Sequence, residues 1–168
     1  KKILKSASFQ EHITNLTTWQ EEVILKLMKS LNLELTPDKE AILSAGNTSF
    51  PGAFNLYLQG SGSCIENCID KEIDDVINFC TRAIEQDKSY GDAYVLLGEA
   101  YLQKYNSTKD SQWSQKGLYA CEQAILINDL LFPAYMTKGK IFRETGQFDQ
   151  AIQELLNYQK IKQADFDV

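Results

Sequence analysis

The hydrophobic positions between residues 132 and 158 fall into two short helical stripes separated by a polar break. The first stripe has the i, i+4, i+7 spacing of one buried helix face and comprises Tyr135, Gly139 and Phe142. The second stripe comprises Ala151, Leu155 and Tyr158. Between them, Gly146 supplies the left-handed residue that commonly ends a helix. The pattern therefore predicts two short helices joined by a tight turn, and the small residues Gly139 and Ala151 allow these helices to cross closely.

The same arrangement recurs twice earlier in the chain. Cys121 lies 34 residues before Leu155, Cys80 lies 41 residues before Cys121, and each cysteine is followed three positions later by alanine. Apolar stripes in residues 51–60 and 91–103 precede these segments, and we predict them as the partner helices. The two earlier second helices have the similar endings AIEQD and AILIND, which argues against coincidence.

Polar stretches lengthen the two earlier helix pairs. Tyr94 and Tyr135 begin equivalent stripes but lie 41 residues apart, seven more than the 34-residue period. The excess falls in residues 104–113, KYNSTKDSQW. A smaller excess of four residues falls in residues 61–70, SGSCIENCID. We therefore expect an inserted loop between the helices of each of the first two pairs.

The period and the residues that carry it resemble the tetratricopeptide repeat (TPR), a helix-turn-helix unit of 34 residues. The second pair fills the family's aromatic, leucine, glycine and tyrosine positions with Tyr94, Leu97, Gly98 and Tyr101. The third pair departs from the family with Lys138 in place of leucine and Tyr158 in place of alanine. The family's proline after the second helix is replaced by Lys88, Asp129 and Gln163.

The resemblance covers about residues 52–165. It implies an all-α fold in which antiparallel helix-turn-helix repeats stack as a short right-handed TPR superhelix, preceded by an N-terminal helical segment. We expect three repeats in residues 51–168, with the sequence stopping at the start of a fourth, and a helical lead-in over residues 1–50.

The lead-in carries helix signals of its own. Thr18 and Glu21 form a capping box ahead of an apolar stripe. The stripe comprises Trp19, Val23, Leu27 and Leu31. Pro37 opens a second predicted helix, because a proline at the first helical position loses no hydrogen bond, and Gly46 ends it.

The join between the lead-in and the first repeat resembles the join between a TolB-like (FlgO-like) domain and TPR repeats in multidomain bacterial signalling proteins. The matching residues are Leu33, Leu35, Thr36 and Pro37, followed by Ala53, Phe54, Leu56, Tyr57, Leu58 and Gly60. This resemblance implies a piece of a larger bacterial regulatory or signalling protein. Residues 1–15, which show no clear period, would then be the tail of the TolB-like domain.

Composition narrows the class of protein. Apolar residues make up 43% of the chain and charged residues 24%, the proportions of an ordinary soluble protein. The net charge of −6 argues against general nucleic-acid binding. No apolar run approaches the roughly 18 residues of a membrane span. We therefore expect a cytoplasmic location and no membrane contact within this sequence, with the periplasm left open if a span lies upstream.

The cysteines and the single histidine do not form a recognisable catalytic or metal site. Cys80 and Cys121 occupy core positions of the repeats, where cysteine acts as a small hydrophobic residue. Cys64 and Cys68 supply only half of the usual four metal ligands, so they are either two free thiols or a local disulfide. His12 stands in the unpatterned lead-in without partners for a catalytic triad. We therefore expect no enzymatic activity, no cofactor and no metal.

The resemblance implies a concave groove lined by repeat positions 2, 5, 9 and 12 of the first helices. The residues that we assign to this groove are Phe54, Tyr57, Asp92, Val95, Glu99, Leu102, Met136, Lys140 and Arg143. The surface mixes apolar patches with Glu99 facing the basic pair Lys140 and Arg143. It suits an extended segment or a helix with a few acidic and apolar anchors, so we expect a protein or peptide partner.

The carboxylate clamp of chaperone-binding TPR proteins is not reproduced. That clamp needs lysine and asparagine where this chain has Val95 and Glu99, and Lys140 is the one matching residue in the next repeat. Two hypotheses remain. The chain is an interaction module with a partner in its groove, or it is a structural spacer or self-association module without a peptide ligand. In the second case its end repeats would stack on another copy as a homodimer, because an uncovered helix face is apolar.

Overall fold

The computed structural model describes residues 23, 26–28, 30, 46–62 and 70–166. The few described residues before Gly46 are helical. Apart from residues 46–50, the rest of the predicted lead-in, including His12, lies outside the described residues, and so do Cys64 and Cys68. The expectations for those residues therefore stay predictions.

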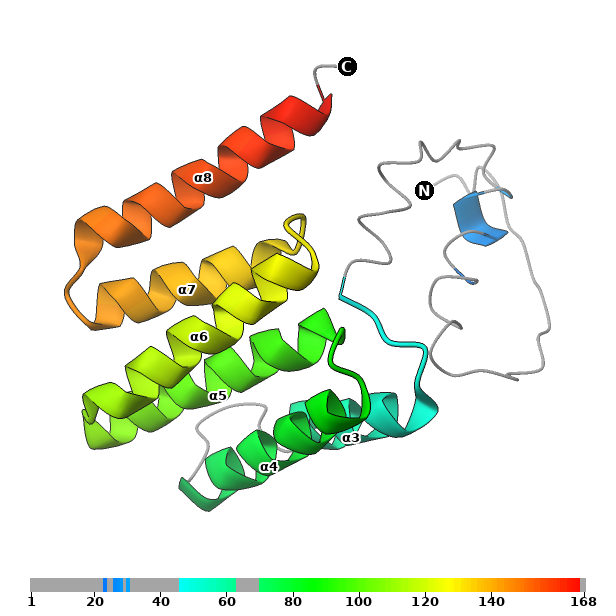
Figure 1. The fold of residues 1–168 in the computed structure, drawn as a ribbon, viewed down its shortest axis with the longest axis horizontal. Helices are drawn as coiled ribbons and strands as arrows, with labels where there is room; N and C mark the ends of the chain where they lie inside the picture. Colours follow the sequence, from blue (N-terminus) through cyan, green and yellow to red (C-terminus); the bar gives the residue numbers. More distant parts are fainter. Residues whose placement is uncertain (1–22, 24–25, 29, 31–45, 63–69, 167–168) are drawn as a thin grey trace, which may run out of the picture.

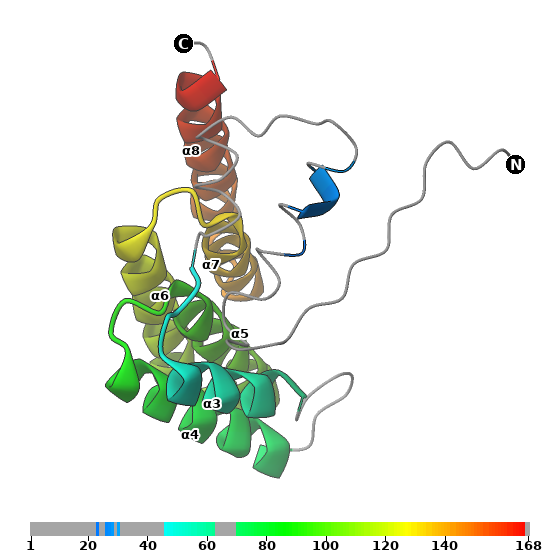
Figure 2. The ribbon, with the colours of Figure 1, turned by 90° about the vertical axis from the view of Figure 1, so that its right-hand side faces the viewer.

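Three antiparallel helix pairs follow one another along the described chain (Figure 1). The first pair consists of α3 (Pro51–Gly62) and α4 (Asp70–Gln86), the second of α5 (Gly91–Thr108) and α6 (Ser111–Ile127), and the third of α7 (Phe132–Glu144) and α8 (Phe148–Phe166). No residue in the described ranges forms a strand. The predicted all-α stack of antiparallel helix-turn-helix repeats is confirmed. Figure 2 shows α6 on one side of this stack, with α5 and α7 following one another on the other side.

Each pair has an equivalent contact, where a glycine of the first helix faces a fixed position of the second. The facing residues are Gly60 with Cys80, Gly98 with Cys121 and Gly139 with Leu155. A Cβ added to the glycine would lie 3.6, 2.9 and 3.8 Å from the facing sulfur or carbon in these three pairs. The added atom would be too close to its neighbour in the second pair and at an ordinary contact distance in the first and third. The contact recurs in the register that the sequence period predicts.

The polar stretch of residues 104–113 is helical rather than a loop, which corrects the sequence-based expectation for the second pair. Only Lys109 and Asp110 separate α5 from α6. Lys109 takes a left-handed φ of 56° and closes α5 by donating its backbone N–H to the Tyr105 carbonyl at 2.7 Å. Asp110 caps α6 by accepting from the Gln112 N–H at 2.9 Å. The added residues therefore lengthen both helices, and the Trp113 ring stacks on Tyr101 with centroids 5.8 Å apart.

Two other local predictions are confirmed. Gly146 has a φ of +77° at the end of α7, the left-handed conformation that a closing glycine supplies. Cys80 and Cys121 are free thiols with no exposed surface, and each packs in an apolar cluster between helices. Both cysteines therefore act as core residues.

The turn between α4 and α5 is tied to the segment before α3 by a buried carboxylate. Asp87 accepts hydrogen bonds from the backbone N–H and the hydroxyl of Ser89, at 2.9 and 2.6 Å, and from the hydroxyl of Thr48. Burial alone would raise the pKa of Asp87, but the hydrogen bonds from Ser89 and Thr48 outweigh it and hold that pKa below its usual value. This network fixes the position of α3 relative to α5.

Candidate functional site

The predicted groove residues of α3 lie partly buried against the next pair. Phe54 and Tyr57 pack on a cluster that includes Ala83 and Ala93, and the Tyr57 ring lies 5.3 Å from the Tyr90 ring, centroid to centroid. Burial, with a smaller contribution from the nearby charge of Asp92, raises the pKa of Tyr57 to about 12. The phenol therefore stays protonated at neutral pH and can donate a hydrogen bond.

Val95 and Leu102 are core residues, which corrects the expectation that they face a partner. Their exposed fractions are 7% and 8%. Val95 packs with Ala124, Leu131 and Ala134, while Leu102 packs with Cys121 and Ile141. The physical reason is that α7 lies against α5 and α6 and covers both side chains. Sequence periodicity places them on the correct face of α5, but it does not show how far the next repeat covers that face.

Asp92 is partly buried at the start of α5. Its backbone N–H donates to the Gly46 carbonyl at 3.0 Å, and its carboxylate lies so close to Gly46 that a Cβ added there would be 2.5 Å from Oδ1. Burial raises the pKa of Asp92 to about 6. This carboxylate is therefore held in a poorly solvated position beside the chain that enters the first pair.

Glu99 and Lys140 meet across the step from the second repeat to the third. Lys140 Nζ lies 3.6 Å from Glu99 Oε1, and the Thr137 hydroxyl donates to the same oxygen at 3.3 Å. The Lys140 and Glu99 side chains are 44% and 41% exposed, so the pair contributes at most about 1 kcal/mol. Arg143 turns to Glu144 instead, at 2.8 Å. The expected arrangement of Glu99 facing two basic residues is therefore half correct, because only Lys140 pairs with it.

Three of the predicted groove residues line a hollow between α7 and α8 of about 280 Å³. They are Met136, Lys140 and Arg143. The other lining residues are small or apolar, namely Gly139, Phe148, Ala151, Ile152 and Leu155. Phe148, Ile152 and Leu155 are 61%, 55% and 43% exposed, which is unusual for large apolar side chains in one place. The hollow therefore combines an exposed apolar floor with two cationic side chains at its edge.

The sequence-based site missed Phe148 and Ile152 and assigned Leu155 to the core. A signal for them exists, because Phe148, Ile152 and Leu155 are spaced i, i+4, i+7 along α8. This is a second apolar stripe on a helix that already has an inner face through Ala151 and Tyr158. Tyr158 does pack inward, with its ring 5.2 Å from Tyr135 and 4.6 Å from Phe132, centroid to centroid.

Among the described residues, the side chains that could bind metal or act as thiol nucleophiles are scattered or buried. No three His, Cys, Asp or Glu side chains among the described residues gather closely enough to hold a metal ion. Burial raises the pKa of both the Cys80 and the Cys121 thiol to about 12, which removes the thiolate that a nucleophile would need. None of the described helices is long and apolar enough to cross a membrane.

Comparison with known proteins supports the fold. No family model matches the sequence, and no curated protein matches it. Among solved structures, two crystal structures of MamA, a TPR-like helical repeat protein, are similar to this chain with a TM-score of 0.55. Their sequences are 22% and 24% identical to it, and the matches cover 90% of this chain and 75% and 72% of the MamA chains. At this identity the likeness establishes a TPR-like helical fold.

Proposed function

We propose that the chain is a protein-interaction scaffold that binds a peptide or a partner domain on its concave side, centred on the hollow between α7 and α8. The observation that carries this proposal is the exposed apolar stripe of Phe148, Ile152 and Leu155 beside Lys140 and Arg143. Exposed apolar surface rimmed by polar groups is typical of interaction sites. The proposed partner is a protein, since a chain with a net charge of −6 is a poor ligand for nucleic acid.

The charges at the hollow indicate the chemistry of the partner. Lys140 and Arg143 are paired with Glu99 and Glu144, and the four side chains are between 31% and 64% exposed. Exchanging one solvated carboxylate for another costs little, because exposed ion pairs are weak. A partner segment that presents an acidic residue beside apolar anchors can therefore replace these internal pairs while it covers Phe148 and Ile152. We assign the apolar contacts to affinity and the charges to orientation.

The resemblance of residues 33–60 to a TolB-like junction supports a wider biological setting. We propose that the scaffold belongs to a larger bacterial regulatory or signalling protein and acts in the cytoplasm. In such a protein the helix pairs would hold a partner near the other domains of the same chain. Expression of this chain with and without the neighbouring gene segments, followed by comparison of partner capture, tests this setting.

Self-association is a second candidate function, and one observation favours it. The exposed stripe of α8 extends to Leu156, which is 41% exposed, so the uncovered face of the last helix is apolar over about two turns. Two copies that join these faces would cover the surface without any peptide ligand. Light scattering over a range of protein concentrations separates the candidates, because a dimer that disappears in the Phe148→Ser/Ile152→Ser variant supports self-association.

The main proposal is tested by selection of short peptides displayed on phage against the whole chain. We expect enrichment of sequences that combine acidic and apolar residues. Binding should be weakened by about tenfold or more in the Lys140→Glu/Arg143→Glu variant. It should be kept in the control Lys71→Glu/Lys88→Glu, which reverses two exposed charges elsewhere. Equal binding by both variants, or no enrichment at all, would contradict the proposal.

A further inference from the structure

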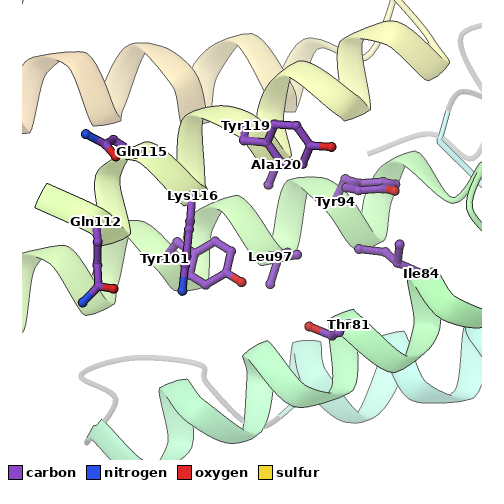
Figure 3. A pocket seen from close by; sticks show the side chains of 10 residues that line it. All are labelled: Thr81, Ile84, Tyr94, Leu97, Tyr101, Gln112, Gln115, Lys116, Tyr119 and Ala120. Atoms are coloured by element: carbon purple, nitrogen blue, oxygen red, sulfur yellow. The ribbon is translucent and has the colours of Figure 1, made fainter.

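A second hollow of about 490 Å³ opens between α4 and α6, with α5 as its floor (Figure 3). The floor is made by Tyr94, Leu97 and Tyr101, which follow one another at i, i+3 and i+7. The walls are Thr81 and Ile84 from α4 and Gln112, Gln115, Lys116, Tyr119 and Ala120 from α6. Its volume and its mostly apolar and aromatic lining are those of a small-molecule site. It shares no lining residue with the hollow between α7 and α8, so it does not depend on the proposed partner surface.

The packing of α5 and α6 explains why this strip stays open. Gly98 and Gly117 meet at the helix crossing, where a Cβ added to either residue would lie 3.4 Å from the carbonyl oxygen of the other. This close crossing draws α6 onto α5, while α4 packs on the other side of the same helix. The rings of Tyr94 and Tyr101 are left only partly covered between them. The close approach of the α5 and α6 backbones therefore sets the depth of this opening.

The hollow has a polar end and an apolar end (Figure 3). The Lys116 ammonium and the Gln112 amide lie toward Tyr101, at the end where α6 begins, while Ile84 and Tyr94 lie at the other end. Gln112 already donates through its side-chain amide to Asp110. Lys116 is the charged residue among those that line the hollow. A ligand of matching polarity has a flat apolar body and a single charged group.

Lys116 is a cation without a carboxylate partner within the described part of the chain. Its Nζ lies 4.4 Å from the centroid of the Trp113 ring and 5.9 Å from that of Tyr101. Lys104 also lies beside Trp113, at 6.0 Å, but it is neutralised by Asp74 through contacts of 2.8 and 2.9 Å. An anion that approaches this end of the hollow therefore meets one unneutralised charge and has no existing ion pair to break.

We propose that this hollow binds a small aromatic carboxylic acid. Its ring system would lie over Leu97 and Ala120 among the tyrosine rings, where offset and edge-to-face contacts are favourable. Its carboxylate would pair with Lys116, which is held at the polar end by the Trp113 ring.

Isothermal titration calorimetry on the whole chain tests this proposal with two probes of nearly equal shape, 2-naphthoic acid and the neutral 2-naphthylmethanol. The acid should bind more tightly than the alcohol. Lys116→Gln should weaken binding of the acid by about threefold, which is the contribution of an exposed ion pair. It should leave the affinity for the alcohol unchanged. Thr81→Trp should abolish binding of both, because it fills the hollow from an exposed position of α4.

Two matched controls keep the result specific. Lys71→Gln removes an exposed lysine outside the hollow, and Arg82→Trp places the same ring one residue further along α4. Both should bind the acid as the unchanged chain does, and circular dichroism should show all variants equally helical. Absence of binding at millimolar acid would overturn the proposal. Binding that survives Thr81→Trp, or a preference for the acid that survives Lys116→Gln, would overturn it as well.

Discussion

Gly98 of α5 and Cys121 of α6 face each other so closely that a Cβ on the glycine would lie 2.9 Å from the cysteine sulfur. The equivalent glycine of the third repeat, Gly139, has its nearest neighbours at 3.8 Å, an ordinary contact distance. The same repeat position therefore has no room for a side chain in the second repeat and has room for one in the third. The difference follows from the neighbours, because Cys121 is fully buried whereas Leu155 is partly exposed.

This difference predicts opposite effects of one substitution. Gly98→Ala should lower the free energy of unfolding by about 1–3 kcal/mol, because the new methyl group must displace a buried sulfur. Gly139→Ala should raise it by up to about 1 kcal/mol, because alanine is the better helix former and meets no close atom. Urea unfolding followed by circular dichroism measures both. Equal effects of the two substitutions would show that the two helix crossings do not differ in the space beside the glycine.

The raised pKa of Asp92 predicts that this residue destabilises the fold above neutral pH. The folded chain holds the Asp92 proton more tightly than the unfolded chain, whose reference value is 3.8. Its favourable contribution is therefore complete below about pH 4 and is lost as the pH rises through about 6. Asp92→Asn should raise the free energy of unfolding near pH 8 by roughly 1–3 kcal/mol and leave it little changed near pH 4.

Urea unfolding of the Asp92→Asn variant at the two pH values provides the measurement. The exposed Asp75→Asn serves as control and should change the free energy of unfolding by less than about 0.5 kcal/mol at either pH. A loss of stability in Asp92→Asn near pH 8 would mean that the ionised carboxylate makes a favourable contact in the folded chain.

Asp87 predicts the opposite pH dependence. Its pKa is lowered in the folded chain, because hydrogen bonds from Ser89 and Thr48 outweigh burial. The stabilisation is therefore present above the unfolded value of 3.8 and is lost as the pH falls through the lower folded value. Asp87→Asn should cost about 1–3 kcal/mol at neutral pH, with the difference from the unchanged chain shrinking in acid. A constant difference across this pH range would argue against an ionised Asp87.

The buried cysteines predict a selective labelling pattern. Cys80 and Cys121 have no exposed surface, and burial raises the pKa of each thiol to about 12. Neither should react with iodoacetamide in the folded chain at neutral pH, and both should react fully in urea. Mass spectrometry of the labelled peptides measures each site separately. Rapid native labelling of Cys121 would indicate that the α5–α6 crossing opens readily.

The helix pairs could be predicted from the sequence because helix periodicity and turn residues depend on nearby positions in the chain. The 34-residue relation of Cys121 to Leu155, and Gly146 at a turn, depend only on periodicity and on backbone conformation. The prediction of an inserted loop at residues 104–113 is wrong, because polar composition alone does not distinguish a loop from a solvated helix. The decisive features were the left-handed Lys109 and the cap at Asp110, which become evident only once both helices are placed.

The candidate site was predictable only in part. Met136, Lys140 and Arg143 share a face of α7 and line one hollow with α8, and their role in binding a partner stays a prediction. Val95 and Leu102 are buried, because α7 covers this part of α5, and the sequence does not show how far that cover extends. The apolar floor of the hollow comes from α8, whose second stripe is visible in the sequence but has meaning only when its neighbours are known. Contacts between repeats, rather than patterns within one repeat, decide which side chains remain free.

In the proposed function, a partner with acidic and apolar residues binds at the hollow between α7 and α8. The most direct measurement is the affinity of a selected peptide for the unchanged chain and for the Lys140→Glu variant, with the peptide in its acidic form and with its acidic residue changed to lysine. We expect Lys140→Glu to weaken binding of the acidic peptide by about three- to tenfold. The peptide with lysine in place of its acidic residue should bind the Lys140→Glu variant more tightly than the acidic peptide does, which recovers part of that loss. An affinity that is indifferent to both changes would contradict the claim.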